Sequence, residues 1–229
     1  MFDSTCEVAV IDATLDWPKY SDRFNELLGD DIKKYKAMKQ EFPDDPEAVI
    51  ISGSTSGIYE EEEWIGALVE RTREYIDNDV PVLGLCFGHQ VIAKAMGAKI
   101  VQMDEYEIGY RPVEFNESEI FRGLDTVEYP FNTHQDKVVE MPEELEPIAE
   151  TEIANQGIQH RKKTVYGVQF HPELVPEIKK KAIRTKEMPD EKKKRLMREV
   201  NEANFHRAKR TLKIIENFLR QAENHAGPK

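Results

Sequence analysis

The chain has 229 residues and a formal net charge of −12 at pH 7. This length suffices for one good-sized α/β domain with a helical addition, and we expect a single domain over residues 1–229. The acidic balance argues against nucleic acid as the main partner, because phosphate binding needs a basic face.

The cysteine count and the apolar runs indicate the compartment. Cys6 and Cys86 are too few for a disulfide framework, and Cys6 is interpreted as a core residue of the first strand. Asp3 and Glu7 stand where a secretion signal would carry its basic region. No apolar run reaches the ~20 residues of a membrane helix. We therefore expect a cytoplasmic protein without a membrane segment.

In chain order, the first half alternates buried strands with amphipathic helices. Strands are predicted at residues 7–12, 48–52 and 82–85, with a further short one near 32–35, and helices at 18–28, 61–76 and 90–96. A small-residue loop, 53–57, follows the second of the long strands, where ligands sit in open α/β sheets. This order predicts a doubly wound, mostly parallel sheet.

After residue 98 the pattern changes to short strands separated by turns. They are predicted at residues 99–103, 110–115, 126–132 and 165–170. Residues 177–210 form a charged helical expansion, whose lysine runs are either solvated faces or a docking site. Apolar residues from Leu196 to Leu219 keep helical spacing and predict a long C-terminal helix that packs by this stripe.

Residues 81–90, Pro-Val-Leu-Gly-Leu-Cys-Phe-Gly-His-Gln, join the third long strand to its helix. A strand that ends in Gly-x-nucleophile-x-Gly and turns directly into a helix is a nucleophile elbow, which exposes the nucleophile above the sheet. The partial positive charge of the helix N-terminus favours the thiolate of Cys86. The alternative is a buried structural cysteine, and the strand-turn-helix geometry decides between the two.

A thiol nucleophile needs a base, and His171 fits best among the six histidines. His171 ends an apolar strand, and Glu173 follows two residues later on the same side of an extended chain. The Glu173 carboxylate can therefore hold the imidazole tautomer and stabilise the imidazolium. The alternative is a strand-end histidine in a turn. His89 is expected to point away from the elbow.

Two motifs resemble those of a known family. Residues 81–90 and Gly167-Val-Gln-Phe-His-Pro-Glu173 resemble the nucleophile and His-Pro-Glu motifs of the class I (triad-type) glutamine amidotransferases. Within that family, the sequence is most similar to the amidotransferase portion of GMP synthase and its free-standing relatives. Residues 132–138, Asn-Thr-His-Gln-Asp-Lys-Val, resemble their Ser-His-x-Asp-Lys-Val loop, and Glu107-Ile-Gly109 resembles their Glu-x-Gly segment.

The resemblance implies a flavodoxin-like α/β fold and a role for each matching position. Cys86 would be the nucleophile, His171 the base and Glu173 its orienter. The oxyanion hole would use the backbone N–H of Phe87 and of Ser54 or Gly53. The residues implied for substrate binding are Gln90, Glu107, Gly109, Thr133 and His134. No metal and no organic cofactor is implied.

Three departures from the family pattern matter, and one of them is the charged expansion of residues 177–210. Gly53-Ser54-Thr55 stands where the family usually has Gly-Gly-Pro, although a backbone donor does not depend on its side chain. No Ser-Gly-Gly-x-Asp-Ser loop for activation by ATP is found in the 229 residues. The resemblance therefore implies hydrolysis of L-glutamine to supply ammonia to an ATP-dependent synthetase partner, of the GMP synthase type.

Two alternatives remain at this point. One is a γ-glutamyl peptidase or hydrolase that uses the same Cys-His-Glu triad without an acceptor subunit. The other is a binding, chaperone or stress-response protein on a similar fold with a cysteine elbow, against which the His-Pro-Glu motif speaks.

Overall fold

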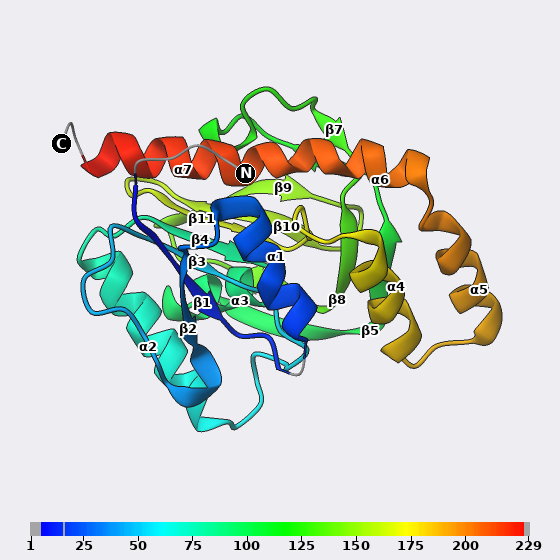
Figure 1. Ribbon diagram of the computed structural model, residues 1–229, viewed down its shortest axis with the longest axis horizontal. Coiled ribbons are helices and arrows are strands. Elements are labelled where there is room, and N and C mark those ends of the chain that lie inside the picture. The colour runs from blue at the N-terminus through cyan, green and yellow to red at the C-terminus, as the bar shows by residue number, and fades with distance from the viewer. Residues whose placement is uncertain (1–5, 16, 227–229) are drawn as a thin grey trace.

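The computed structural model describes residues 6–15 and 17–226, and a nine-stranded sheet forms its centre (Figure 1). The strand order is β2-β1-β3-β4-β11-β10-β9-β6-β7. Five neighbours run parallel: β2 (Lys33–Lys36), β1 (Val8–Asp12), β3 (Ala48–Ile51), β4 (Val82–Leu85) and β11 (Val165–Val168). The sheet continues antiparallel through β10 (Asn155–His160), β9 (Leu145–Glu150), β6 (Val113–Phe115) and β7 (Val127–Glu128). The predicted strands of the first half are confirmed.

Helices cover both faces of the parallel part, which explains its unbroken apolar runs. Val10, Ile50 and Leu83 pack on the face covered by α1 (Pro18–Leu28) and α7 (Lys213–Ala226). Their neighbours in the strands turn to the opposite face, where α2 (Glu63–Asp77) and α3 (Phe87–Ala95) lie. This is the expected flavodoxin-like, doubly wound arrangement.

The second half holds more strand than the sequence predicts. β5 (Lys99–Tyr110) and β8 (Phe131–Glu140) pair as a separate antiparallel ribbon, and both are longer than the short strands expected there. β9 and β10 lie outside the predicted strands. The inward positions of β8 carry polar residues, namely Asn132, His134 and Asp136, so the strand lacks the usual apolar alternation.

The C-terminal helix begins later than its apolar stripe suggests. Residues 177–210 fold as α4 (Pro176–Thr185), α5 (Asp190–Glu199) and α6 (Glu202–Ala208). Leu196 belongs to α5, and the helical backbone is interrupted at Asn201. The Asn201 side chain accepts a hydrogen bond from the Asn204 N–H at 3.0 Å and caps α6. From there a helical run leads through a 3₁₀ turn, 209–212, into α7 (Figure 1).

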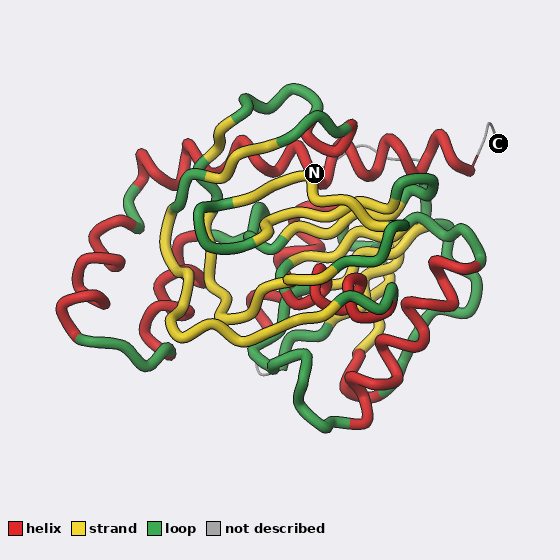
Figure 2. The backbone as a smooth tube through the Cα atoms, turned by 180° about the vertical axis from the view of Figure 1, so that it is seen from behind, coloured by secondary structure: helices red, strands yellow, loops and turns green. Residues whose placement is uncertain are grey.

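The carboxyl ends of β3, β4 and β11 meet at one edge of the sheet. Figure 2 shows the strands side by side from the opposite direction. The 53–57 loop, Cys86 and residues 169–173 leave these three ends, so the sheet brings them together. In the part of the chain that the structure describes, no helix is both long and apolar enough to span a membrane.

Candidate active site

Cys86 occupies a strained turn between β4 and α3, with φ 52° and ψ −98°. A side chain at such a positive φ costs about 1–3 kcal/mol. Both flanking glycines are sterically required: a Cβ at Gly84 would lie 2.3 Å from the Gly88 carbonyl, and one at Gly88 would lie 2.4 Å from the Ile51 oxygen. The predicted strand-turn-helix geometry of an elbow is therefore present.

Cys86 is only 5% exposed, and Gln169 contacts its sulfur. The Gln169 Nε2 donates to Sγ at 3.4 Å, while its Oε1 accepts from Gln90 Nε2 at 3.1 Å. Gln169 thus fixes the orientation of both Cys86 and Gln90. No sequence pattern singles Gln169 out, although it lies within the motif that ends at Glu173.

His171 lies between Cys86 and Glu173. Its Nδ1 is 2.7 Å from Glu173 Oε1, and its backbone N–H donates to the Phe131 carbonyl at 2.9 Å. Burial alone would lower the pKa of His171, but the charges of Cys86 and Glu173 and their hydrogen bonds to the ring outweigh it and raise that pKa to about 10. The imidazole therefore readily holds a proton between its two partners.

Glu173 is fully buried, which by itself would raise its pKa. The His171 charge and hydrogen bonds from His171 and Tyr20 outweigh burial, and the net shift of its pKa is downward. The Tyr20 hydroxyl donates to Oε1 at 2.5 Å. Arg23 holds the backbone at the same point, donating from Nε to the Glu173 carbonyl at 2.8 Å. The carboxylate is thus fixed as an anion.

Of the two residues of the 53–57 loop expected to donate to an oxyanion, only Ser54 remains a candidate. The Gly53 N–H donates to the Tyr20 hydroxyl at 3.1 Å, so it is already engaged. A Cβ at Gly53 would lie 2.9 Å from both His171 Cε1 and the Tyr20 oxygen, which explains the glycine as a packing requirement. Ser54 is left as the candidate donor from this loop. Phe87 is the first residue of α3, and its N–H has no acceptor within the helix.

A cavity of about 160 Å³ opens beside Cys86. Gln90, Thr133 and His134 border it, as the resemblance implies. Glu107 and Gly109 do not border it, so the expectation that they contact the substrate is not supported.

Glu107 and Gly109 instead support the cavity from behind. Glu107 Oε2 lies 3.0 Å from His134 Nε2, and Gln156 Nε2 donates to the same oxygen at 2.8 Å. Gly109, with φ +103°, lies against α5, where a Cβ would approach Leu196 Cδ2 to 2.8 Å. Glu107 orients a wall residue, and Gly109 makes room for a helix.

Asp136 also borders the cavity, although the sequence alone assigns it no role. The residue is 7% exposed, and its Oδ1 has no hydrogen-bond partner among the described residues. Burial raises the pKa of this carboxyl, an effect that hydrogen bonding from Tyr59 and the charge of His134 oppose. Its i, i+2 spacing from His134 places both on the same face of β8, and this signal could have identified it.

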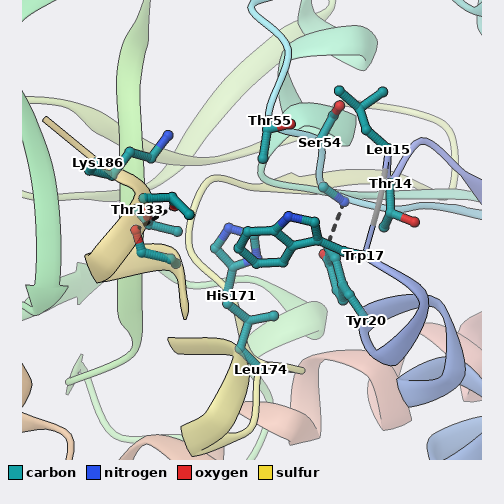
Figure 3. A pocket seen from close by; sticks show the side chains of 13 residues that line it. Thr14, Leu15, Trp17, Tyr20, Ser54, Thr55, Thr133, His171, Leu174 and Lys186 are labelled. Atoms are coloured by element: carbon teal, nitrogen blue, oxygen red, sulfur yellow. Dashed lines mark hydrogen bonds between the residues drawn. The ribbon is translucent and has the colours of Figure 1, made fainter. Parts of the chain in front are cut away.

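A smaller, mostly apolar pocket lies on the other side of His171 (Figure 3). Trp17 and Leu174 lie beside the imidazole, with Leu15 and Tyr20 on one side and Lys186 and Thr133 on the opposite side. No group of three or more His, Cys, Asp or Glu side chains within residues 6–15 and 17–226 is placed to hold a metal ion.

The fold and the site together define a class of protein. It is an α/β protein in which a cysteine elbow and a His-Glu pair lie at the ends of adjacent parallel strands. The family model "Glutamine amidotransferase class-I" matches residues 24–189. The chain therefore belongs to the class I glutamine amidotransferase family, as the two motifs suggested.

Curated relatives include enzymes named "GMP synthase [glutamine-hydrolyzing]". The one from Staphylococcus epidermidis is 36% identical over 130 residues, and the one from Aliivibrio fischeri is 37% identical over 132 residues. Each match covers 56% of this chain and 24% of the relative, so the chain spans about a quarter of the length of these proteins. These relatives do not favour the γ-glutamyl peptidase alternative.

Solved structures support the fold. A glutamine amidotransferase from Thermotoga maritima has a TM-score of 0.74 at 23% identity, covering 93% of this chain and 97% of that one. A glutamine amidotransferase from Methylobacillus flagellatus has a TM-score of 0.75 at 16% identity, covering 95% and 96%.

Proposed function

We propose that the chain hydrolyses the side-chain amide of L-glutamine through a thioester on Cys86 and delivers the ammonia to a synthetase. The observation that carries this proposal is the position of His171. Its ring bonds to a buried carboxylate on one side and interacts with the elbow cysteine on the other. That is the arrangement of nucleophile, base and orienter.

In the first half-reaction the Cys86 thiolate attacks the amide carbon. The developing oxyanion accepts hydrogen bonds from the Phe87 and Ser54 N–H groups, and each such donor contributes about 10²–10³ in rate. Protonated His171 gives its proton to the leaving nitrogen, so the C–N bond breaks and ammonia departs. A γ-glutamyl thioester remains on Cys86.

In the second half-reaction water replaces ammonia. Neutral His171 takes a proton from the water, and the hydroxide attacks the thioester carbon. The C–S bond then breaks, which releases glutamate and restores the Cys86 thiolate beside a protonated His171. Glu173 stays ionised throughout and stabilises the imidazolium, an assignment that its lowered pKa supports.

The cavity suits the amino-acid end of glutamine. Asp136 supplies a buried carboxylate oxygen without a partner among the described residues, which fits an α-ammonium group. Gln90, Thr133 and His134 complete the wall, and Glu107 holds His134 in place. A free α-ammonium group would satisfy the acceptor that Asp136 leaves open.

The proposed partner follows from the relatives. They carry the name GMP synthase, and this chain matches about a quarter of their length. We infer that an ATP-dependent synthetase of that type receives the ammonia, in the cytoplasm. The Asn132 to Lys137 strand, next to the site, is included in the surface where it docks.

Ammonia and glutamate release from L-glutamine tests the function. The purified chain should release both in equal amounts, faster when a GMP synthase-type synthetase is added, and Cys86→Ala should release neither. High turnover of γ-glutamyl-cysteinyl-glycine with little turnover of glutamine, unchanged by the synthetase, would instead identify a γ-glutamyl peptidase. Absence of turnover on both compounds would contradict the assignment of Cys86.

A further inference from the structure

The connection between α4 and α5 carries a lysine to the mouth of the site. Lys186 directly follows α4 and borders both the cavity beside Cys86 and the apolar pocket beside His171. In Figure 3 its side chain lies next to Thr133, opposite Tyr20 and Leu15. The charged helical expansion of residues 177–210, called the helical insertion below, therefore adds a cation to the site at the carboxyl ends of β3, β4 and β11.

Packing on both sides holds this connection in place. Ile178 and Ile183 of α4 are buried in the core, and Leu196 of α5 is buried against Gly109. Lys192 of α5 forms an ion pair with Glu105 at 2.8 Å. Lys186 itself lies with Nζ 4.5 Å from the centroid of the Tyr106 ring, which also borders the cavity. Its position is thus set by the buried face of α4, one buried side chain of α5 and an aromatic contact.

The Lys186 ammonium has unused bonding capacity. Among the described residues it makes neither a hydrogen bond nor an ion pair within 4.0 Å, whereas Lys192 and Lys194 of the same insertion both pair with carboxylates. Burial lowers the pKa of Lys186, and the charges of Cys86 and Asp136 oppose that shift. Lys186 is half-buried and has no anion as a partner, so an incoming carboxylate would stabilise its ammonium group.

We propose that Lys186 binds the α-carboxylate of the substrate, so that the helical insertion sets specificity for the free amino-acid end. This rests on the proposed glutaminase function. Asp136 and Lys186 border the same cavity with opposite charges, which matches the α-ammonium and α-carboxylate of one zwitterion. A simple amide without these charges satisfies neither residue. The pair thus selects γ-glutamyl amino acids over other primary amides.

Two glutamine analogues separate this role from general damage. The first is 4-aminobutanamide, which is glutamine without the α-carboxylate; the second is glutaramate, which lacks the α-amino group and keeps the carboxylate. Lys186→Met should lower kcat/KM for L-glutamine and for glutaramate roughly ten- to hundredfold, mainly through KM. It should leave kcat/KM for 4-aminobutanamide within about twofold. Lys186→Arg should restore most of the loss, and Lys194→Met on the exposed face of α5 should have no effect.

Binding supplies a second readout that does not need turnover. L-Glutamine should bind the Cys86→Ala protein in calorimetry, and adding Lys186→Met should weaken that binding by the same factor as the rise in KM. Equal losses on all three amides, or unchanged binding, would overturn the role of Lys186 while the glutaminase function stands. Absence of glutamine turnover by the wild type, alone and with the synthetase, would overturn the proposed function itself.

Discussion

Tyr20 and Glu173, 153 positions apart in the chain, are joined by a hydrogen bond of 2.5 Å. The same tyrosine hydroxyl accepts the Gly53 N–H at 3.1 Å, so one oxygen connects the carboxylate behind His171 to the 53–57 loop, the proposed source of an oxyanion donor. The proposed base and the proposed oxyanion hole are therefore positioned by a shared contact.

Replacing Tyr20 by Phe removes that contact with little change in volume. We expect kcat for glutamine to fall about ten- to hundredfold with little change in KM, because a hydrogen bond to a charged group contributes about 1.5–3 kcal/mol. Steady-state ammonia release measures this. Tyr75→Phe is the matched control, since the Tyr75 hydroxyl is also buried and donates to the Pro43 carbonyl at 2.6 Å. Equal kcat values for the two variants would show that Tyr20 acts only through stability.

The two histidines near the cavity should respond differently to substitution. His171→Ala should lose about as much activity as Cys86→Ala, because members of one catalytic unit do not contribute additively. His134→Ala should mainly raise KM, since His134 borders the cavity without contacting Glu173. The loss of activity in Glu173→Gln should lie between that of His171→Ala and that of His134→Ala. Measured kcat and KM for the four variants decide this, and an inactive His134→Ala beside an active His171→Ala would reverse the assignment.

These site predictions show what local spacing can reveal. Gly84, Cys86 and Gly88 lie within five residues and predict the elbow geometry, and His171 and Glu173 lie within three and predict the His-Glu contact, so the sequence contained both features. Tyr20 and Gln169 act through contacts that exist only after distant segments meet, and no local pattern marks them.

The fold shows the same division. Strands buried on both faces, such as β3 and β4, appear as apolar runs and are predicted almost to the residue. β8 is predicted too short because its inward side chains are the polar groups of the site. Lys186 lies in a lysine-rich tract, and no local pattern distinguishes it there from lysines such as Lys192 and Lys194, which pair with carboxylates.

Lys179 provides a test of stability against pH. It is 1% exposed, and its Nζ lies 4.9, 5.4 and 5.0 Å from the ring centroids of Tyr110, Phe131 and Phe205. Burial lowers the pKa of Lys179 to about 8, although the charge of Glu173 opposes this. Between about pH 8 and 10.5 the unfolded chain holds this proton more tightly than the folded one, so the folded state gains stability as pH rises through that range.

Lys179→Met should therefore raise the free energy of unfolding at pH 7 by about 1–3 kcal/mol, because it removes a buried charge and keeps the volume. The gain should shrink as pH rises from about 8 to 10.5, where the wild-type lysine loses its proton in the fold. Urea unfolding at several pH values measures both effects, with Lys194→Met as a surface control. A loss of stability at pH 7 would mean that the three ring contacts outweigh the cost of burial.

Two glycines give opposite expectations for the same substitution. Gly109 has φ +103° and faces Leu196, so Gly109→Ala should lower the free energy of unfolding by about 2 kcal/mol and displace α5. Gly66 lies in α2 with open space around it, and Gly66→Ala should raise it by about 0.5–1 kcal/mol. Chemical unfolding of both variants checks the pair. An unchanged free energy of unfolding in Gly109→Ala would show that α5 packs more loosely than its contact with Gly109 indicates.

The position of β11 has a consequence for synthesis of the chain. β11 pairs with β4 in the middle of the sheet, yet it begins only at Val165, long after β4 has ended at Leu85. Until β11 is made, β4 is an open edge with an exposed row of N–H and C=O groups, a site where nascent chains pair wrongly with one another. Cys86 is already present on that edge, but its base and its carboxylate arrive only with β11. If the proposed mechanism holds, a growing chain is unable to consume glutamine until its central strand is in place, and the closing of this gap in the sheet also completes the proposed catalytic site.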